Sequence, residues 1–243
     1  MRLSLLSMSS SPFHFKKFSI FQEGVAQSVG TDGVLLGAWA DTTSAKTILD
    51  IGTGTGLIAL MLAQRTAPDV TITAIDLHRG SVDCACENVK RSLWCDRIAV
   101  IETAVQEFAG STARQYDLIV SNPPFFSELT ISPNAARNVA RHTATLSIGD
   151  LLAAVKLLLA PGGKCCLILP EKEGKRLCEL SVPLGLFCAR AVHVWSRVGK
   201  PMERLLLQLE RDPGRFNRES LAIYGEFEGY SDEYKALTQD YYL

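Results

Sequence analysis

The chain has 243 residues, of which 47% are hydrophobic, and its formal net charge at pH 7 is −1. This length can bury one well-packed domain, and the composition is that of an ordinary soluble globular protein. No apolar run approaches the roughly 18 residues of a membrane span, and residues 1–7 have too short an apolar core for a secretory signal. We therefore expect a cytoplasmic protein without a membrane-spanning segment.

The sequence shows no internal repeat, low-complexity tract or linker, so we expect one domain over residues 13–243, a disordered segment at 1–12 and a monomer. Residues 13–30 are expected to form an N-terminal flap. Residues 219–243 are acidic and rich in tyrosine, and we expect them to form a helix packed on the sheet. Residues 1–218 then hold 24 Lys and Arg against 20 Asp and Glu, a net charge of +4, which is compatible with a polyanionic partner.

A glycine-rich loop follows the first predicted strand, at residues 47–51, and precedes a predicted helix at 57–63. A strand, a glycine loop and a helix form the first unit of a doubly wound nucleotide-binding fold. The glycines of the loop, which let the backbone turn sharply and approach a ligand, are Gly52, Gly54 and Gly56. A dinucleotide fingerprint needs glycine at the sixth position, where this chain has Leu57, so a nicotinamide-dependent oxidoreductase is disfavoured.

Two acids flank this unit. The pattern Asp-x-Gly-x-Gly-x-Gly, which starts at Asp50, is similar to motif I of S-adenosylmethionine (AdoMet)-dependent methyltransferases. AdoMet has no pyrophosphate, and its methionine ammonium can be met by a carboxylate such as Asp50. A second predicted strand, at 70–75, ends at Asp76, which lies 24 residues after Gly52. An acid about 20 residues past the loop is placed to accept hydrogen bonds from both ribose hydroxyls.

A stiff arch follows another apolar strand, at residues 116–121: Asn122, Pro123, Pro124 and Phe125. The prolines fix their own φ, restrict the residue before them and carry no N–H, so carbonyl groups face the site with little competition. Asn122 adds a side-chain acceptor, and Phe125 adds a flat apolar face. Two acceptors can take both hydrogens of an exocyclic amine, which is the chemistry that amine methylation requires.

The alternation of helices and strands continues along the chain. We expect helices at 80–92 and at 151–160 (with Asp150 as N-cap) and strands at 97–101, 164–169, 190–195 and 204–210. The last two strands are too close for a crossover helix, so they should be antiparallel. The pattern predicts an α/β, doubly wound, seven-stranded Rossmann-like fold of the class I AdoMet methyltransferase type, with an antiparallel terminal hairpin and, by analogy, the strand order 3-2-1-4-5-7-6. Ligands of such sheets bind at the carboxyl ends of the strands, where Asp50, Asp76 and Asn122 lie.

Metal binding is not expected. The seven cysteines form no Cys-x-x-Cys pair, and the four histidines lack the spacing of metal ligands. We expect reduced thiols that act as small apolar residues.

Further motifs are Phe15-Lys16-Lys17-Phe18, residues 29–39, Pro133-Asn134, Arg141-His142-Thr143, Phe216-Asn217-Arg218-Glu219 and Tyr241-Tyr242-Leu243. Together with the arch and in this order, they resemble the bacterial tRNA1(Val) (adenine-N6)-methyltransferase family over nearly everything after residue 13. That family methylates N6 of the adenosine just 3′ of the anticodon in one valine tRNA. The resemblance implies AdoMet as cofactor and tRNA as partner.

The resemblance also implies roles for residues near the cofactor. A helix that begins with Thr31 and Asp32 would cover the methionine end of AdoMet, whereas the residues alone indicate only that either could cap a helix. Methyltransferases usually carry an acid just past the third strand for the cofactor's adenine amine, and this chain has Ala104 there. Thr103, Glu102 or a backbone group is left to take that role, and we predict Thr103.

The target base would leave its stack, rest on Phe125 and donate from N6 to the Asn122 side chain and the Pro123 carbonyl. The phenylalanines of the flap would either contact nucleotides or fold over the cofactor. The basic residues that are candidates for phosphate contacts are Lys16, Lys17, Arg137, Arg141, Arg197, Lys200 and Arg204.

Other activities share the arch. DNA adenine-N6, rRNA guanine-N2 and protein glutamine-N5 methyltransferases use it, but the chain lacks the target-recognition, duplicated or N-terminal helical domains expected of those enzymes. A non-catalytic AdoMet-binding RNA module is a further alternative, and the intact Asn122–Phe125 segment argues against it.

Overall fold

The computed structural model describes residues 11–22, 29–124, 146–197, 199–225 and 228–242. Three residues with predicted roles in RNA binding, namely Phe125, Arg137 and Arg141, lie outside the described residues, as do residues 1–10 of the segment predicted to be disordered.

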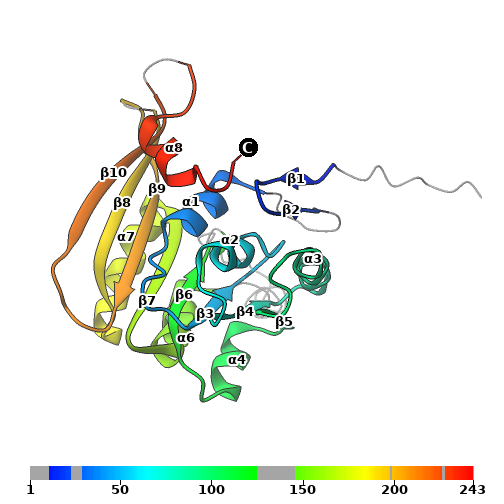
Figure 1. Cartoon of the computed structure of the whole chain (residues 1–243). Coiled ribbons are helices and arrows are strands. Elements are labelled where there is room, and N and C mark those ends of the chain that lie inside the picture. The colour runs from blue at the N-terminus through cyan, green and yellow to red at the C-terminus, as the bar shows by residue number, and fades with distance from the viewer. Residues whose placement is uncertain (1–10, 23–28, 125–145, 198, 226–227, 243) are drawn as a thin grey trace, which may run out of the picture.

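One mixed sheet of eight strands forms the centre of the fold, in the order β10-β8-β9-β7-β6-β3-β4-β5 (Figure 1). In chain order, these strands are β3 (Thr47–Ile51), β4 (Thr71–Asp76), β5 (Ile98–Glu102), β6 (Tyr116–Ser121), β7 (Leu159–Pro170), β8 (Phe187–Arg197), β9 (Met202–Glu210) and β10 (Asn217–Tyr224). Strands β3 to β7 pair in parallel, and β9 is antiparallel to both β7 and β8. The predicted order of seven strands and the antiparallel terminal hairpin are confirmed.

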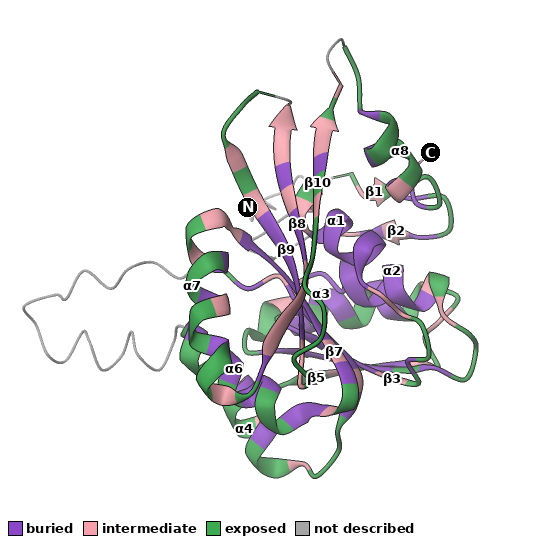
Figure 2. Cartoon of the chain, turned by 90° about the vertical axis from the view of Figure 1, so that its left-hand side faces the viewer, coloured by how far each residue is buried: buried purple, intermediate pink, exposed green. Residues whose placement is uncertain are grey.

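Helices cover both faces of this sheet. The hydrophobic cluster on one face includes residues of α1 (Thr31–Trp39), α2 (Leu57–Arg65), α3 (Arg79–Lys90) and α8 (Asp232–Thr238). The cluster on the other face includes residues of α4 (Val105–Ser111), α6 (Ile148–Leu158) and α7 (Glu171–Ser181), which the 3-10 helix Val182–Leu184 follows. Helices α1 and α2 are buried on nearly every side (Figure 2), as expected of helices that are apolar all round. This packing fixes the amino ends of both helices beside the carboxyl edge of the sheet, where the ligands of such folds bind.

The eighth strand, β10, corrects the prediction that residues 219–243 form a helix, since only Asp232–Thr238 of that range is α-helical. β10 lies parallel to β8 at the edge of the sheet. Its side chains alternate with the period of two that defines a strand: Leu221 is buried and Ser220 is exposed. Glu219 accepts hydrogen bonds from the Arg190 guanidinium at 3.0 Å, which joins β10 to β8.

Two helix starts also differ from the prediction. The N-cap of α6 is Ser147 and not Asp150: the Ser147 hydroxyl accepts from the Asp150 N–H and donates to the Asp150 carboxylate. The acid is at the third helical position, as in a capping box, but it accepts from the Ser147 hydroxyl and not from the backbone N–H of the N-cap residue. The N-cap of α1 is Gly30, and no described side chain caps the helix. Thr31 and Asp32 are its first two helical residues, and the Asp32 carboxylate binds Arg204.

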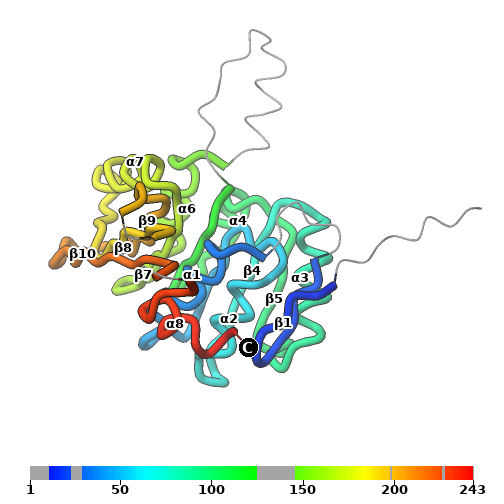
Figure 3. Tube along the Cα trace, turned by 90° about the horizontal axis from the view of Figure 1, so that it is seen from above, coloured from blue at the N-terminus to red at the C-terminus, as the bar shows by residue number. Residues whose placement is uncertain are grey.

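The predicted flap packs against the C-terminal segment. Its hairpin, β1 (Phe13–His14) and β2 (Ser19–Ile20), lies beside the C-terminal end of the chain (Figure 3). The Lys16 N–H and ammonium donate to the carbonyl groups of Tyr241 and Gln239 at 2.8 and 2.6 Å. Phe15 and Phe18 are only 4% and 8% exposed, so they belong to the hydrophobic core and cannot stack on a nucleotide in this fold.

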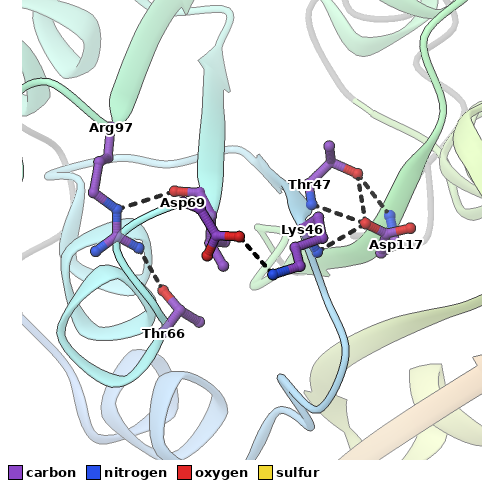
Figure 4. Close-up of polar contacts among 7 residues, drawn as sticks. Lys46, Thr47, Thr66, Asp69, Arg97 and Asp117 are labelled. Atoms are coloured by element: carbon purple, nitrogen blue, oxygen red, sulfur yellow. Dashed lines mark hydrogen bonds and ion pairs between the residues drawn. The ribbon is translucent and has the colours of Figure 1, made fainter.

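Polar contacts join the amino ends of neighbouring strands, at the edge opposite to the glycine loop (Figure 4). One carboxylate oxygen of Asp117 accepts hydrogen bonds from the N–H groups of Lys46 and Thr47 and from the Thr47 hydroxyl, at 2.9 to 3.0 Å. Partial burial disfavours ionisation of Asp117, but these hydrogen bonds outweigh it and hold the pKa of Asp117 below its ordinary 3.8. Asp69 instead forms an exposed ion pair with Lys46.

Asp117→Ala is expected to lower the free energy of unfolding by about 2 kcal/mol, because it leaves two N–H groups at the start of β3 without their acceptor. This difference in the free energy of unfolding between wild type and variant should have its full size above pH 3.8. It should become smaller at lower pH, as the pH falls through the lowered pKa of Asp117 and the wild-type carboxylate is protonated. Urea denaturation measures it, with Asp69→Ala as the matched control, since an exposed ion pair contributes little. Equal losses in the two variants would contradict this role of Asp117.

Among the described residues, no helix is long and apolar enough to cross a bilayer. No group of three or more His, Cys, Asp or Glu side chains that could hold a metal ion is found in the same part of the chain.

Candidate active site

The glycine loop connects β3 to α2 at the carboxyl edge of the sheet. Gly52 and Gly54 have φ values of +71° and +58°, in the left-handed region that favours glycine. A Cβ atom added to either residue would meet no atom within 4 Å. The backbone therefore faces open space at the point where a ligand can approach it most closely.

Asp76 holds this loop in place. One of its carboxylate oxygens accepts from the Gly54 N–H and the other from the His78 N–H, both at 2.9 Å. The N–H groups of Gly52 and Thr53 donate to the Ile75 carbonyl, one residue before Asp76. Asp76 is 8% exposed and lies at the end of β4, as predicted. Each carboxylate oxygen can accept a further hydrogen bond, so the contacts to the loop are compatible with a contact to ribose.

Asp50 lies behind the loop and is completely buried. The Thr53 hydroxyl donates to one of its oxygens at 2.7 Å. In the described part of the chain the other oxygen makes no close hydrogen bond, although the Ala59 N–H lies near the carboxylate and lowers its pKa. Burial raises the pKa of Asp50 to about 7, and the Asp76 charge adds to this effect, against the hydrogen bond from Thr53. A buried acceptor without a partner is costly, so we expect a ligand, or a water molecule that links a ligand to it, as the missing donor.

A cleft of about 440 Å³ lies beside the loop. It brings together six of the residues predicted from the sequence, namely Thr31, Asp32, Gly52, Gly54, Asn122 and Arg204. Gly56, Asp50, Asp76 and Thr103 are not among its lining residues. Sequence reasoning missed the far wall, where Val194 and Ser196 of β8 and Ile223 and Tyr224 of β10 line the cleft.

Asn122 directly follows β6, whose last residue, Ser121, donates from its hydroxyl to the Ile51 carbonyl at 2.8 Å. This contact ties the start of the arch to the end of β3, next to the glycine loop. Asn122 is half-buried, Pro123 is buried and Pro124 is exposed. The proposed amine acceptor and the loop therefore share one cleft.

Thr103 lies just past β5, where its N–H donates to the Asp76 carbonyl at 2.9 Å and its hydroxyl donates to the Ala104 carbonyl at 3.2 Å. Glu102, the other candidate for the cofactor's adenine amine, forms an ion pair with Arg79 at 3.1 Å. Thr103 thus adjoins Asp76, and both residues lie at the carboxyl ends of β4 and β5, next to the glycine loop.

AdoMet fits these features. The left-handed glycines leave space for a ligand against the backbone, a buried carboxylate oxygen lacks a donor, and the cleft holds both acidic and basic side chains. The cofactor would lie across the loop, with its ribose toward Asp76 and its methionine end toward the start of α1.

Comparison with known proteins identifies the family. Residues 28–171 match the family model described as the methyltransferase small domain. The tRNA1(Val) (adenine(37)-N6)-methyltransferase of Trichodesmium erythraeum is 44% identical over 97% of this chain and 99% of the relative. The chain belongs to the tRNA1(Val) (adenine-N6)-methyltransferase family. The protein of the same name from Parabacteroides distasonis is 43% identical over 97% and 99% of the two chains, which confirms the resemblance inferred from the motifs.

Solved structures support the fold of this family member. A predicted O-methyltransferase from Agrobacterium tumefaciens is 16% identical, with a TM-score of 0.66, over 86% of this chain and 96% of its own. A TehB-like SAM-dependent methyltransferase from Corynebacterium glutamicum is 18% identical, with a TM-score of 0.52, over 77% and 90%. The class I methyltransferase fold predicted from the sequence is thereby confirmed.

The raised pKa of Asp50 leads to a pH-dependence. Stability contributed by protonated Asp50 is fully present below its ordinary pKa of 3.8 and is lost as the pH rises through about 7. A ligand ammonium favours the carboxylate, so the affinity for S-adenosylhomocysteine should rise with pH, by up to about tenfold per pH unit between about 5 and 7. Calorimetric titration measures this, and Asp50→Asn should remove the slope. An unchanged slope in Asp50→Asn would assign the titration to another group.

Proposed function

We propose that this protein transfers the methyl group of AdoMet to the N6 amine of an adenosine in tRNA, most simply the adenosine just 3′ of the anticodon in tRNA1(Val). The two relatives reported above are named for this activity, and each aligns with nearly the whole chain. The structural observation that carries the proposal is that Asn122 shares a cleft with Gly52 and Gly54. An amine acceptor and a nucleoside-binding loop in one cleft are what such a transfer needs.

The residues of the chain would act by position and charge. When bound, AdoMet supplies a methyl group that a nitrogen lone pair can attack. The Asn122 side-chain oxygen and the Pro123 carbonyl accept the two hydrogens of the N6 amine and so aim its lone pair. The same acceptors stabilise the positive charge that grows on nitrogen. The proton can then leave to water, so the transfer needs no dedicated base.

The target adenosine would leave its stack to reach the cleft. Stacking of the extruded base on Phe125 would contribute about 1–3 kcal/mol. We further propose that the protein acts in the cytoplasm as a single-domain monomer.

Methyl transfer from labelled AdoMet into total small RNA that lacks this modification, followed by nucleoside analysis, tests the proposal. N6-methyladenosine confined to one valine tRNA is the expected result. N2-methylguanosine, or label in DNA or protein alone, would overturn the substrate. No label in any pool, with AdoMet still bound, would favour a non-catalytic module.

A further inference from the structure

The charged side chains of the cleft are few. Among the described residues that line it, Asp32 and Glu203 are acidic and Arg204 is the only basic one. The methionine end of AdoMet carries an ammonium group and a carboxylate group. A carboxylate that leaves bulk water needs a cation or several hydrogen-bond donors to replace its hydration. Arg204 is thus the described lining residue with the charge that this carboxylate requires.

The topology explains how Arg204 reaches the cleft. β9 runs antiparallel to its two neighbours, so its first residues lie at the edge where the parallel strands end. Arg204 is paired with Pro170, the last residue of β7, and with Val194 of β8, which itself lines the cleft. Arg204 therefore lines the cleft from the terminal hairpin. The glycine loop follows β3, in the parallel part of the sheet (Figure 1).

Asp32 holds the guanidinium in place. The Arg204 Nε atom donates to an Asp32 carboxylate oxygen at 2.8 Å, and one terminal nitrogen donates to the Glu203 carbonyl at 3.0 Å. The side chains of Arg204 and Asp32 are only 28% and 23% exposed, so the pair is partly shielded from water. A guanidinium presents five donors in one plane and can bind two carboxylates at different edges.

We propose that Arg204 binds the carboxylate of the methionine moiety of AdoMet and that Asp32 positions Arg204 for this contact. The inference rests on the proposed function, because it takes AdoMet as the ligand of the cleft. The Asp32–Arg204 pair is neutral, and the ammonium and carboxylate of the methionine end cancel, so this contact buries no net charge beyond that of the sulfonium of AdoMet. This role is an alternative to the phosphate contact that the sequence suggested for Arg204.

Calorimetric titration of the full chain with two ligands tests the inference. The ligands are S-adenosylhomocysteine and its decarboxylated analogue, which lacks only the carboxylate. Arg204→Gln should weaken binding of S-adenosylhomocysteine roughly 10- to 100-fold and should change binding of the analogue by about twofold or less. Asp32→Asn should show the same pattern with a smaller loss, because it acts through Arg204.

Two further variants complete the design. Arg218→Gln is the matched control, since Arg218 is an exposed arginine of β10 that does not line the cleft, and it should bind both ligands like the wild type. Arg204→Lys keeps the charge without the planar fork and should bind S-adenosylhomocysteine more tightly than Arg204→Gln. It also provides a second test if Arg204→Gln does not fold.

The outcomes separate this inference from the proposed function. If the wild type binds S-adenosylhomocysteine but Arg204→Gln binds it equally well, or loses both ligands to the same degree, the role of Arg204 is overturned and the proposed function stands. If the wild type binds neither ligand nor AdoMet, the proposed function fails and the inference fails with it.

Discussion

Asn122→Ala is expected to lower the rate of methyl transfer by about 10²- to 10³-fold while changing the affinity for S-adenosylhomocysteine by about twofold or less. The Asn122 side chain lies at the cleft, at the end of β6, where it can accept from the target amine. In the proposed mechanism it orients the reacting nitrogen and stabilises its growing charge, whereas other residues hold the cofactor. Single-turnover methylation of unmodified tRNA and calorimetric titration measure the two quantities separately.

Asn122→Asp sharpens this test, because a carboxylate keeps an acceptor at the same position and should retain more activity than alanine. Asn217→Ala is the matched control, since Asn217 is exposed at the start of β10 and bonds only within that strand among the described contacts. A parallel loss of S-adenosylhomocysteine binding in Asn122→Ala would contradict the assignment of this residue to the target.

Asp76→Ala is expected to have the opposite signature and to weaken S-adenosylhomocysteine binding roughly 10- to 100-fold. The substitution removes the proposed acceptor of the ribose hydroxyls. It also removes the partner of the Gly54 N–H, so the loop loses the contact that holds its shape. Calorimetry measures the affinity, and thermal unfolding of the ligand-free protein shows how much of the change comes from a loosened fold.

Asp76→Asn is a second test of the carboxylate. An amide retains one acceptor, but its NH2 group faces an N–H donor of the loop or of His78, and two donors cannot pair. It should therefore also bind weakly. Asp83→Ala is the control, because Asp83 is an exposed acid of α3 paired with Arg79. Unchanged affinity in Asp76→Ala would refute the ribose assignment.

The features that sequence reasoning predicted correctly are those encoded locally. A β-branched apolar run that ends in three glycines specifies a strand, a turn and a helix within residues 47–63, almost regardless of the rest of the chain. Because parallel strands present their carboxyl ends at one edge, the positions of Asp50, Asp76 and Asn122 followed from the strand assignments alone. The order of seven strands then came from the resemblance to a known fold.

The features that sequence reasoning missed depend on partners far away in the chain. β10 has a buried face only because β8 lies beside it, and its opening residues, which include Arg218 and Glu219, are too polar to read as a core strand. The contact between Asp32 and Arg204 joins residues 172 positions apart, and no spacing rule connects them. The sequence left open whether Phe15 and Phe18 contact nucleotides or fold over the cofactor, because their burial against Tyr242 and Trp94 is not visible in it.

The walls of the cleft come from residues as early as Val29 and as late as Tyr224. During synthesis, the walls of the cleft are therefore complete only after the last strand of the sheet has left the ribosome and docked. A ligand that binds only the completed fold stabilises it by mass action, by about 2.7 kcal/mol at a concentration one hundred times its dissociation constant. Cellular AdoMet would thus stabilise finished molecules of the newly made protein, whereas chains cut short before β10 would lack the wall that Ile223 and Tyr224 form.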